Sequence, residues 1–261
     1  MRPLLAAERF KLRKNHTFQT LILFLAVTIL LYAAVACFSQ LRDGGFAVTL
    51  TVMELYANAI TINQLLLKIL LGVLAGFFIA SEYAAGVLKR SVSAGRGREW
   101  IYASKLAVYT LGVVSAALVI PVLAILLGCL LNGLGLLAGF GRQEGVTLLA
   151  YSLRTLGFTA LFGAGYASIA AWIAVWLADA GRTIGVSIVF FLFVDQILNS
   201  LSGYFPLLKS LYDYSLFKLF ADTAAFQMSG EGVLLCLIVP IATIAVFALL
   251  GVCRFRRKEI H

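Results

Sequence analysis

The sequence predicts an all-α integral membrane protein with six transmembrane helices. Of its 261 residues, 62% are apolar and only 13% are charged, whereas soluble domains carry about 25% charged residues. The chain contains six stretches close to the length of a membrane span, and its basic residues gather in alternate connecting segments. Too little polar surface remains to cover a soluble domain, so we expect a single transmembrane domain over residues 1–261.

The six predicted spans follow from the thickness of a bilayer. A hydrocarbon core of about 30 Å needs roughly 20 apolar residues in a helix. Four of the stretches, the first, third, fourth and sixth, contain no charged residue at all. The predicted spans are residues 21–38, 62–81, 106–131, 155–178, 183–201 and 233–253.

The second and fifth spans each carry a charged side chain. The charge-free run after Lys68 is too short to cross the membrane, so the second span begins near Ile62. We expect Lys68 about two turns from the outer end, where its stem can reach the interface. Asp195, with Gln196 and Asn199 close by, is the carboxylate of the fifth span. It either lines a cargo path or forms a buried pair with Lys68.

Basic residues predict the orientation of the chain. With the N-terminus inside, the cytoplasmic segments hold 15 of the 21 Lys and Arg residues, the outer segments hold five, and Lys68 lies within a span. This bias places both termini in the cytoplasm. The four-residue connector 179–182 lies on that side and predicts that the fourth and fifth spans form an antiparallel hairpin.

Ridges of small residues predict where the spans pack closely, and prolines predict where they bend. Ridges of small residues let helices approach closely, either within one chain or in a dimer. Pro121 and Pro240 lie within predicted spans and are expected to kink them. The ridges, at four-residue spacing, are Gly72, Gly76 and Ala80 in the second span and Ala160, Ala164 and Ser168 in the fourth.

The segment between the fifth and sixth spans, Ser202 to Gly232, predicts short outer helices. Lys218 and Asp222 are an i, i+4 pair. This amphipathic segment is expected to lie on the outer leaflet or to dip back into it. One predicted apolar stripe joins Leu208, Leu211, Leu216 and Leu219.

The motifs of membrane enzymes are missing from the sequence. No H-E-x-x-H pair and no G-x-x-x-x-G-K-[ST] phosphate loop occur, and the predicted spans hold no histidine. Four cysteines lie in or beside apolar stretches without a C-x-x-C pair. We therefore expect no catalytic residue, no metal site and no nucleotide site in this chain.

The predicted cytoplasmic loop after the second span, Ser81 to Lys105, mixes apolar and basic residues. Glu82 marks the point where the chain leaves the membrane, and glycines surround Arg96. We expect a short helix before this basic turn and a second short helix between the turn and the third span. The charges obey the positive-inside rule, and the apolar residues among them also predict a docking surface for a cytoplasmic partner.

This loop resembles that of the type-2 ABC transporter permeases. The leader from Ala7 to Lys14 looks like the amphipathic elbow helix of that family, and the tail from Phe255 to Ile260 is similar to its basic ending. Val87 and Gly97 stand where threonine and serine are common in the family. The positions that match the loop motif are Glu82, Tyr83, Gly86, Lys89, Gly95, Arg98, Ser104 and Lys105.

The resemblance implies a permease subunit in a bacterial cell membrane. It would pair with a second permease copy or paralogue and with cytoplasmic ABC ATPase subunits, which would bind ATP and Mg²⁺ in place of this chain. The implied ATPase-coupling residues are Glu82, Tyr83, Gly86, Leu88, Lys89, Arg90, Gly95, Arg96, Arg98 and Glu99.

The cargo is predicted only as a class, and two other functions compete with ATP-driven transport. Resemblance to small permeases suggests export of an amphipathic or hydrophobic compound, such as an antimicrobial peptide, a drug or a lipid-linked molecule, in resistance or immunity. An ATP-independent channel or secondary transporter is the main alternative, although the chain shows no internal repeat and little mid-membrane polarity beyond Asp195. A membrane scaffold or immunity protein without transport is the third.

Overall fold

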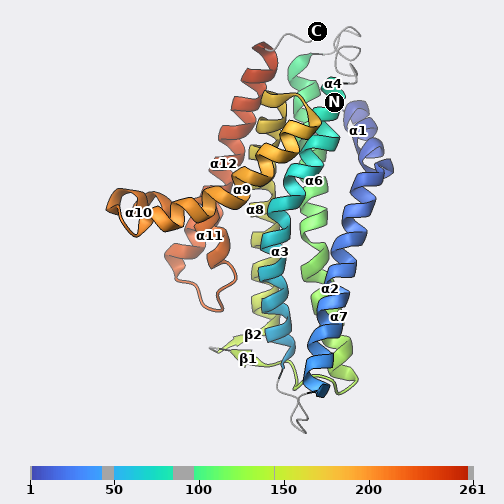
Figure 1. Ribbon diagram of the computed structural model, residues 1–261, viewed down its shortest axis with the longest axis vertical. Helices are drawn as coiled ribbons and strands as arrows, with labels where there is room; N and C mark the ends of the chain where they lie inside the picture. Colours follow the sequence, from blue (N-terminus) through green and yellow to red (C-terminus); the bar gives the residue numbers. More distant parts are fainter. Residues whose placement is uncertain (1, 43–49, 85–96, 144, 258–261) are drawn as a thin grey trace.

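The structure is a computed structural model that describes residues 2–42, 50–84, 97–143 and 145–257 (Figure 1). Almost all of these residues are helical. The helices are α1 (Arg2–Lys14), α2 (His16–Arg42), α3 (Val52–Ala75), the π-helical turn η1 (Gly76–Ala80), α4 (Ser81–Ala84), α6 (Arg98–Ala117), α7 (Val119–Gly133), α8 (Leu148–Leu177), α9 (Ala180–Ser202), α10 (Pro206–Asp213), α11 (Leu216–Asp222) and α12 (Gly230–Arg257). Strands β1 (Arg142–Gln143) and β2 (Val146–Thr147) form a short antiparallel pair.

The predicted all-α membrane fold is confirmed. Within the described residues, six helical segments are long and apolar enough to cross a membrane. They form an elongated bundle with two different ends (Figure 1). We call the end that holds α1, α4 and the last turns of α12 the elbow end; β1 and β2 lie at the opposite end.

Helix α8 is the centre of the bundle. Two thirds of its most apolar window is buried, compared with about a tenth for α9 and α12. Small residues allow its neighbours to approach: a Cβ atom on Gly165 would lie 3.6 Å from Pro240 of α12. Ser168, the last residue of the predicted ridge in this span, is buried and packs within the chain, whereas Ala160 and Ala164 are only half-buried.

The glycines of the second predicted span pack against α9. A Cβ atom on Gly72 would lie 2.9 Å from the Cβ of Ser187, and one on Gly76 would lie 2.5 Å from Cγ1 of Ile184. Larger side chains would therefore push α9 away. Of the two roles considered for this ridge, packing within the chain is the one that the structure shows for both glycines.

The two mid-span prolines have different effects. The third span breaks at Leu118, three residues before Pro121, where α6 ends and α7 begins. Proline lacks an N–H and its ring clashes with the carbonyl four residues earlier, so this break is the expected result. Pro240, in contrast, lies inside α12, which runs on without interruption.

Two predicted connections differ from the structure. The link between α8 and α9 is only Ala178, which adopts a left-handed conformation (φ 55°), and Asp179, whose carboxylate accepts the N–H of Arg182 and so starts α9 early. Also, within the described residues the second predicted short helix is not separate from the third span. Arg98 already begins α6, because no glycine or proline interrupts residues 98–117 before Gly112, which α6 accommodates.

The segment between the fifth and sixth spans forms two helices beside the middle of the bundle. Helix α9 runs obliquely, and α10 continues from it away from the bundle, with α11 close by (Figure 1). The predicted single leucine stripe is wrong. Ser215 caps a new helix, so Leu216 and Leu219 are buried in the core while Leu211 stays exposed.

Candidate functional site

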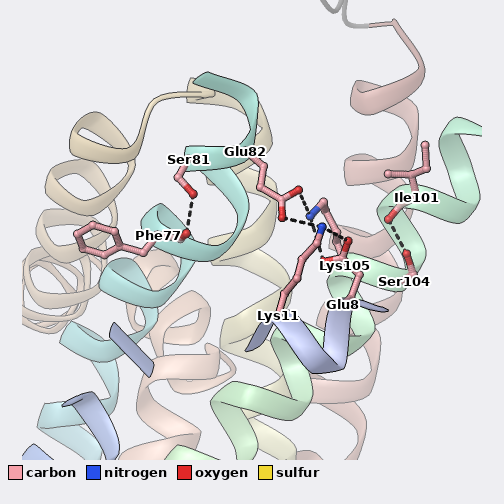
Figure 2. Close-up of polar contacts among 8 residues, drawn as sticks. All are labelled: Glu8, Lys11, Phe77, Ser81, Glu82, Ile101, Ser104 and Lys105. Carbon is pink, nitrogen blue, oxygen red and sulfur yellow. Dashed lines mark hydrogen bonds and ion pairs between the residues drawn. The ribbon is translucent and has the colours of Figure 1, made fainter. Parts of the chain in front are cut away.

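Four charged side chains meet at the elbow end and form what we call the ion cluster: Glu8 and Lys11 of α1, Glu82 of α4 and Lys105 of α6 (Figure 2). The Lys105 Nζ atom lies 3.2 Å from Oε2 of Glu8 and also pairs with Glu82. The Lys11 Nζ atom lies 3.1 Å from Glu8 and 3.3 Å from Glu82. Each lysine therefore bridges both carboxylates, and three helices are joined at one point.

The ion cluster is electrically balanced and largely buried. Glu8 is 6% exposed and Lys105 is 2% exposed. Removing one member of such a buried set leaves an uncompensated charge, which typically costs about 3–5 kcal/mol. The cluster is therefore a strong constraint on the relative position of α1, α4 and α6.

Lys11 lies at the solvent side of the ion cluster. Partial burial lowers the pKa of Lys11, but the nearby carboxylates of Glu82 and Glu8 more than compensate, so its pKa lies above the usual 10.5. A raised lysine pKa contributes stability below the unfolded-state value, and this contribution is lost as the pH rises through the folded-state value. Lys11 therefore keeps its charge and its contacts at neutral pH.

Local packing explains why these four side chains meet. Leu12 is buried against Gly112 of α6, where an added Cβ would lie 2.9 Å from its Cδ2 atom, so α1 lies close on α6. The π-helical turn η1 adds a residue to one turn and so rotates the residues that follow it. The hydroxyl of Ser81 donates to the carbonyl of Phe77 at 2.6 Å inside this turn (Figure 2). Glu82 follows directly.

A second contact region at the elbow end, which we call the tail junction, joins α12 to α4 and α6. The ring of Phe255 lies 6.1 Å from that of Tyr83 and 5.8 Å from that of Tyr102, measured between centroids. Arg256 pairs with Glu99, and its carbonyl accepts a hydrogen bond from Arg98 at 3.0 Å. The members of the tail junction are Tyr83, Arg98, Glu99, Tyr102, Phe255 and Arg256.

The two contact regions include four of the ten predicted coupling residues. Glu82 belongs to the ion cluster, and Tyr83, Arg98 and Glu99 belong to the tail junction. Six further predicted positions, Gly86, Leu88, Lys89, Arg90, Gly95 and Arg96, lie outside the described residues. The described residues thus show what holds the two ends of segment 85–96, at α4 and at the start of α6.

Several members of these regions did not appear among the predicted coupling residues. Glu8 is the single acidic residue in the first 42, and an acid kept in a basic leader was the available signal. Lys11 follows it at i+3, on the same helix face. Lys105 matched the family loop motif, but its ion-pair partner could not be recognised from the sequence, because Glu8 lies 97 residues away.

A second buried ion pair lies in the middle of the bundle. The Lys68 Nζ atom is 2.6 Å from Oδ2 of Asp195, and each side chain is 15% exposed. The hydroxyl of Tyr212 on α10 donates to Oδ1 of the same carboxylate at 3.2 Å. Asp195 therefore joins α3, α9 and α10.

The expectation that Lys68 reaches the outer interface is wrong. The second span begins at Val52, ten residues before the predicted start, so Lys68 lies at the middle of a helical segment of 32 residues. At the middle of this segment its ammonium group forms an ion pair with Asp195. Of the two alternatives for Asp195, the buried pair is formed, while Gln196 and Asn199 are exposed and do not join it.

One family model matches this chain. It is described as "ABC-2 family transporter protein" and covers residues 4–196, from α1 through the ion cluster to Lys68 and Asp195. No curated protein matches the chain significantly.

The ion cluster predicts unequal effects for its two lysines. Lys105→Met should leave Glu8 and Glu82 buried with reduced compensation and lower the melting temperature by about 6–20 °C. Lys11→Met, the matched control, removes a 43% exposed side chain and should cost less than about 1 kcal/mol. Both are measured by thermal unfolding of the purified chain in detergent. Equal shifts would contradict the assigned roles.

The mid-bundle pair predicts rescue by a second substitution. Asp195→Asn should destabilise the fold by about 3 kcal/mol, because Lys68 is left buried without its counter-charge. The double variant Lys68→Met, Asp195→Asn should recover more than half of this loss in the same unfolding assay. A double variant no more stable than the single one would show that the pair is not the source of the effect.

Proposed function

Because this chain belongs to the ABC-2 transporter family and is a membrane permease subunit, we propose that it exports an amphipathic or hydrophobic compound at the expense of ATP hydrolysed by a partner. The cargo class comprises antimicrobial peptides, drugs and lipid-linked molecules, and the physiological role is antimicrobial resistance or immunity. ATP and Mg²⁺ would bind to the separate ABC ATPase rather than to this multi-pass subunit.

The observation that carries this proposal is the anchoring of α4 and α6, the helices on either side of segment 85–96. The ion cluster holds α4 and α6 against α1, and the tail junction holds them against α12. Because the helices on both sides of this segment are fixed to the bundle, a push that reaches them from a docked ATPase would be passed to the spans. This supports the basic loop as the docking surface.

Several features support placing the elbow end in the cytoplasm. With this orientation, 15 of the 21 basic residues fall on the cytoplasmic side, as positive-inside bias requires. The first and last described helices both reach the elbow end (Figure 1). The cell would be bacterial, in keeping with the resemblance of the loop.

The proposed path of the motion runs along the second span. Glu82 lies 14 residues from Lys68, a rise of about 21 Å along the helix. Through Asp195 and Tyr212, Lys68 contacts α9 and α10. Displacement of α4 would therefore move α9 and α10 together.

A second permease copy would complete the cargo path. Helices α9 and α2 bury only 11% and 17% of their most apolar windows within this chain, so both have faces available to another copy. Asp195 is occupied by Lys68 and Tyr212, so we assign cargo contact to the exposed Gln196 and Asn199 of α9 instead. The second copy is either identical or a paralogue.

An ATP-independent channel or secondary transporter is the alternative function. Such carriers usually expose several polar or ionisable groups along a mid-membrane pathway. In the described part of this chain, the two mid-membrane charges neutralise each other. This pairing and the family favour the hypothesis of ATP-driven transport.

We predict that Glu82→Gln uncouples ATP hydrolysis from transport. The chain would be co-expressed with its ATPase, which we expect the neighbouring reading frame to encode, and the purified complex would be reconstituted in liposomes. Loss of one carboxylate from the ion cluster should lower ATP-driven transport by about 2- to 30-fold while the complex still assembles. The control is Glu231→Gln, an exposed residue at the start of α12.

Two results would contradict this function. If no ATPase co-purifies with the chain, and ATP has no effect on its transport, the hypothesis of ATP-driven transport is wrong. If Glu82→Gln and Glu231→Gln transport equally well, the ion cluster does not carry the coupling.

A further inference from the structure

A groove of about 740 Å³ lies where α1, α2 and α6 meet. We call it the elbow groove. Its polar rim includes Arg9, Arg13 and Gln19, and its apolar floor includes Ile22 and Leu111, with Ser115 at the far end. One opening therefore combines positive charge with a hydrophobic surface.

The arginines of the rim lie on the opposite side of Leu12 from the ion cluster. Arg9 and Arg13 are one turn apart, so both guanidinium groups lie on one face of α1. Both are exposed. Lys11 and Lys105 each contact two carboxylates, whereas within the described residues neither arginine contacts an acidic side chain. The rim thus has positive charge that no described acidic side chain neutralises.

The floor runs from the rim toward the middle of the bundle. Val108 and Ser115 are seven residues apart on α6, so the floor covers two helical turns, about 10 Å. Leu111 between them is 63% exposed. The Gln19 side chain donates to the carbonyl of Arg13 at 2.9 Å and holds α2 against the end of α1 beside the groove.

We propose that the elbow groove binds an anionic phospholipid of the cytoplasmic leaflet. The choice of leaflet rests on the orientation proposed above. The phosphate lies between Arg9 and Arg13, since guanidinium groups match phosphate oxygens in geometry and charge. One acyl chain lies along α2 and α6 over Leu111. A soluble phosphate compound would leave this apolar floor uncovered.

Binding at this position would brace the ion cluster. Arg9 and Leu12 are the immediate neighbours of Glu8 and Lys11 along α1. A lipid that contacts α1, α2 and α6 together would hold α1 in the position that the ion cluster requires. Lipid composition would then regulate coupling between the ATPase and the spans.

Lipid binding to the purified full chain tests this proposal without any ATPase. Phosphatidylglycerol and phosphatidylcholine would be titrated separately and counted by native mass spectrometry. We expect phosphatidylglycerol to bind more tightly, and Arg9→Gln with Arg13→Gln to weaken it by about fivefold for each arginine. Arg182→Gln, an exposed arginine of α9 away from the groove, is the matched control and should leave binding unchanged.

A second variant tests the apolar floor. Ser115→Phe fills the end of the groove and should weaken binding of both lipids while both arginines remain. Glycerol 3-phosphate, which lacks acyl chains, should not displace phosphatidylglycerol. Melting temperatures in the absence of added lipid identify any variant that fails to fold. If Ser115→Phe does not fold, the arginine variants, which alter exposed side chains, still test the proposal.

Three results would overturn the proposal. Equal binding of the two lipids would show that the rim does not recognise an anionic headgroup. An equal loss in Arg182→Gln would show that binding depends on surface charge alone. Displacement by glycerol 3-phosphate would identify a site for soluble phosphate compounds instead of a lipid.

Discussion

Burial of opposite charges in the ion cluster is the constraint on which the elbow end depends. Glu8 and Lys105 are almost excluded from solvent, so α1 cannot leave α6 without exposing an unpaired charge to an apolar surrounding. Glu82 brings the end of the second span into the same set. Helices α1, α4 and α6 are therefore held as one unit, and the tail junction adds α12 to it.

The Lys68–Asp195 pair repeats this principle in the middle of the bundle. One continuous helical segment, α3 with η1 and α4, carries a member of each charged site. At its elbow end it is fixed to α1 and α6, and at its centre it is fixed to α9 and α10. A permease needs such a connection, because the force of an ATPase acts at one membrane surface while cargo passes along the spans.

Local composition predicted the number of spans, whereas one local capping signal was overlooked and most contacts between distant residues were not predicted. The lengths of the apolar runs were sufficient to predict six spans, and Lys68 was one of the two alternatives considered for Asp195. The start of the second span was missed although Thr51 and Glu54 form a capping box that fixes it. The ion cluster could not be predicted, because its contacts depend on Leu12 packing against Gly112 and join residues 71 and 97 positions apart.

The ion cluster predicts that α1 and α6 move as one unit when the partner ATPase binds and hydrolyses ATP. Spin labels on the exposed positions Phe10 and Trp100, in a chain whose four cysteines are replaced, would report the distance between these helices by pulsed electron resonance. We predict one narrow distance that is unchanged when ATP binds to the complex, and a broadened one in Lys105→Met. A shift of this distance in the parent protein on ATP binding would contradict the account.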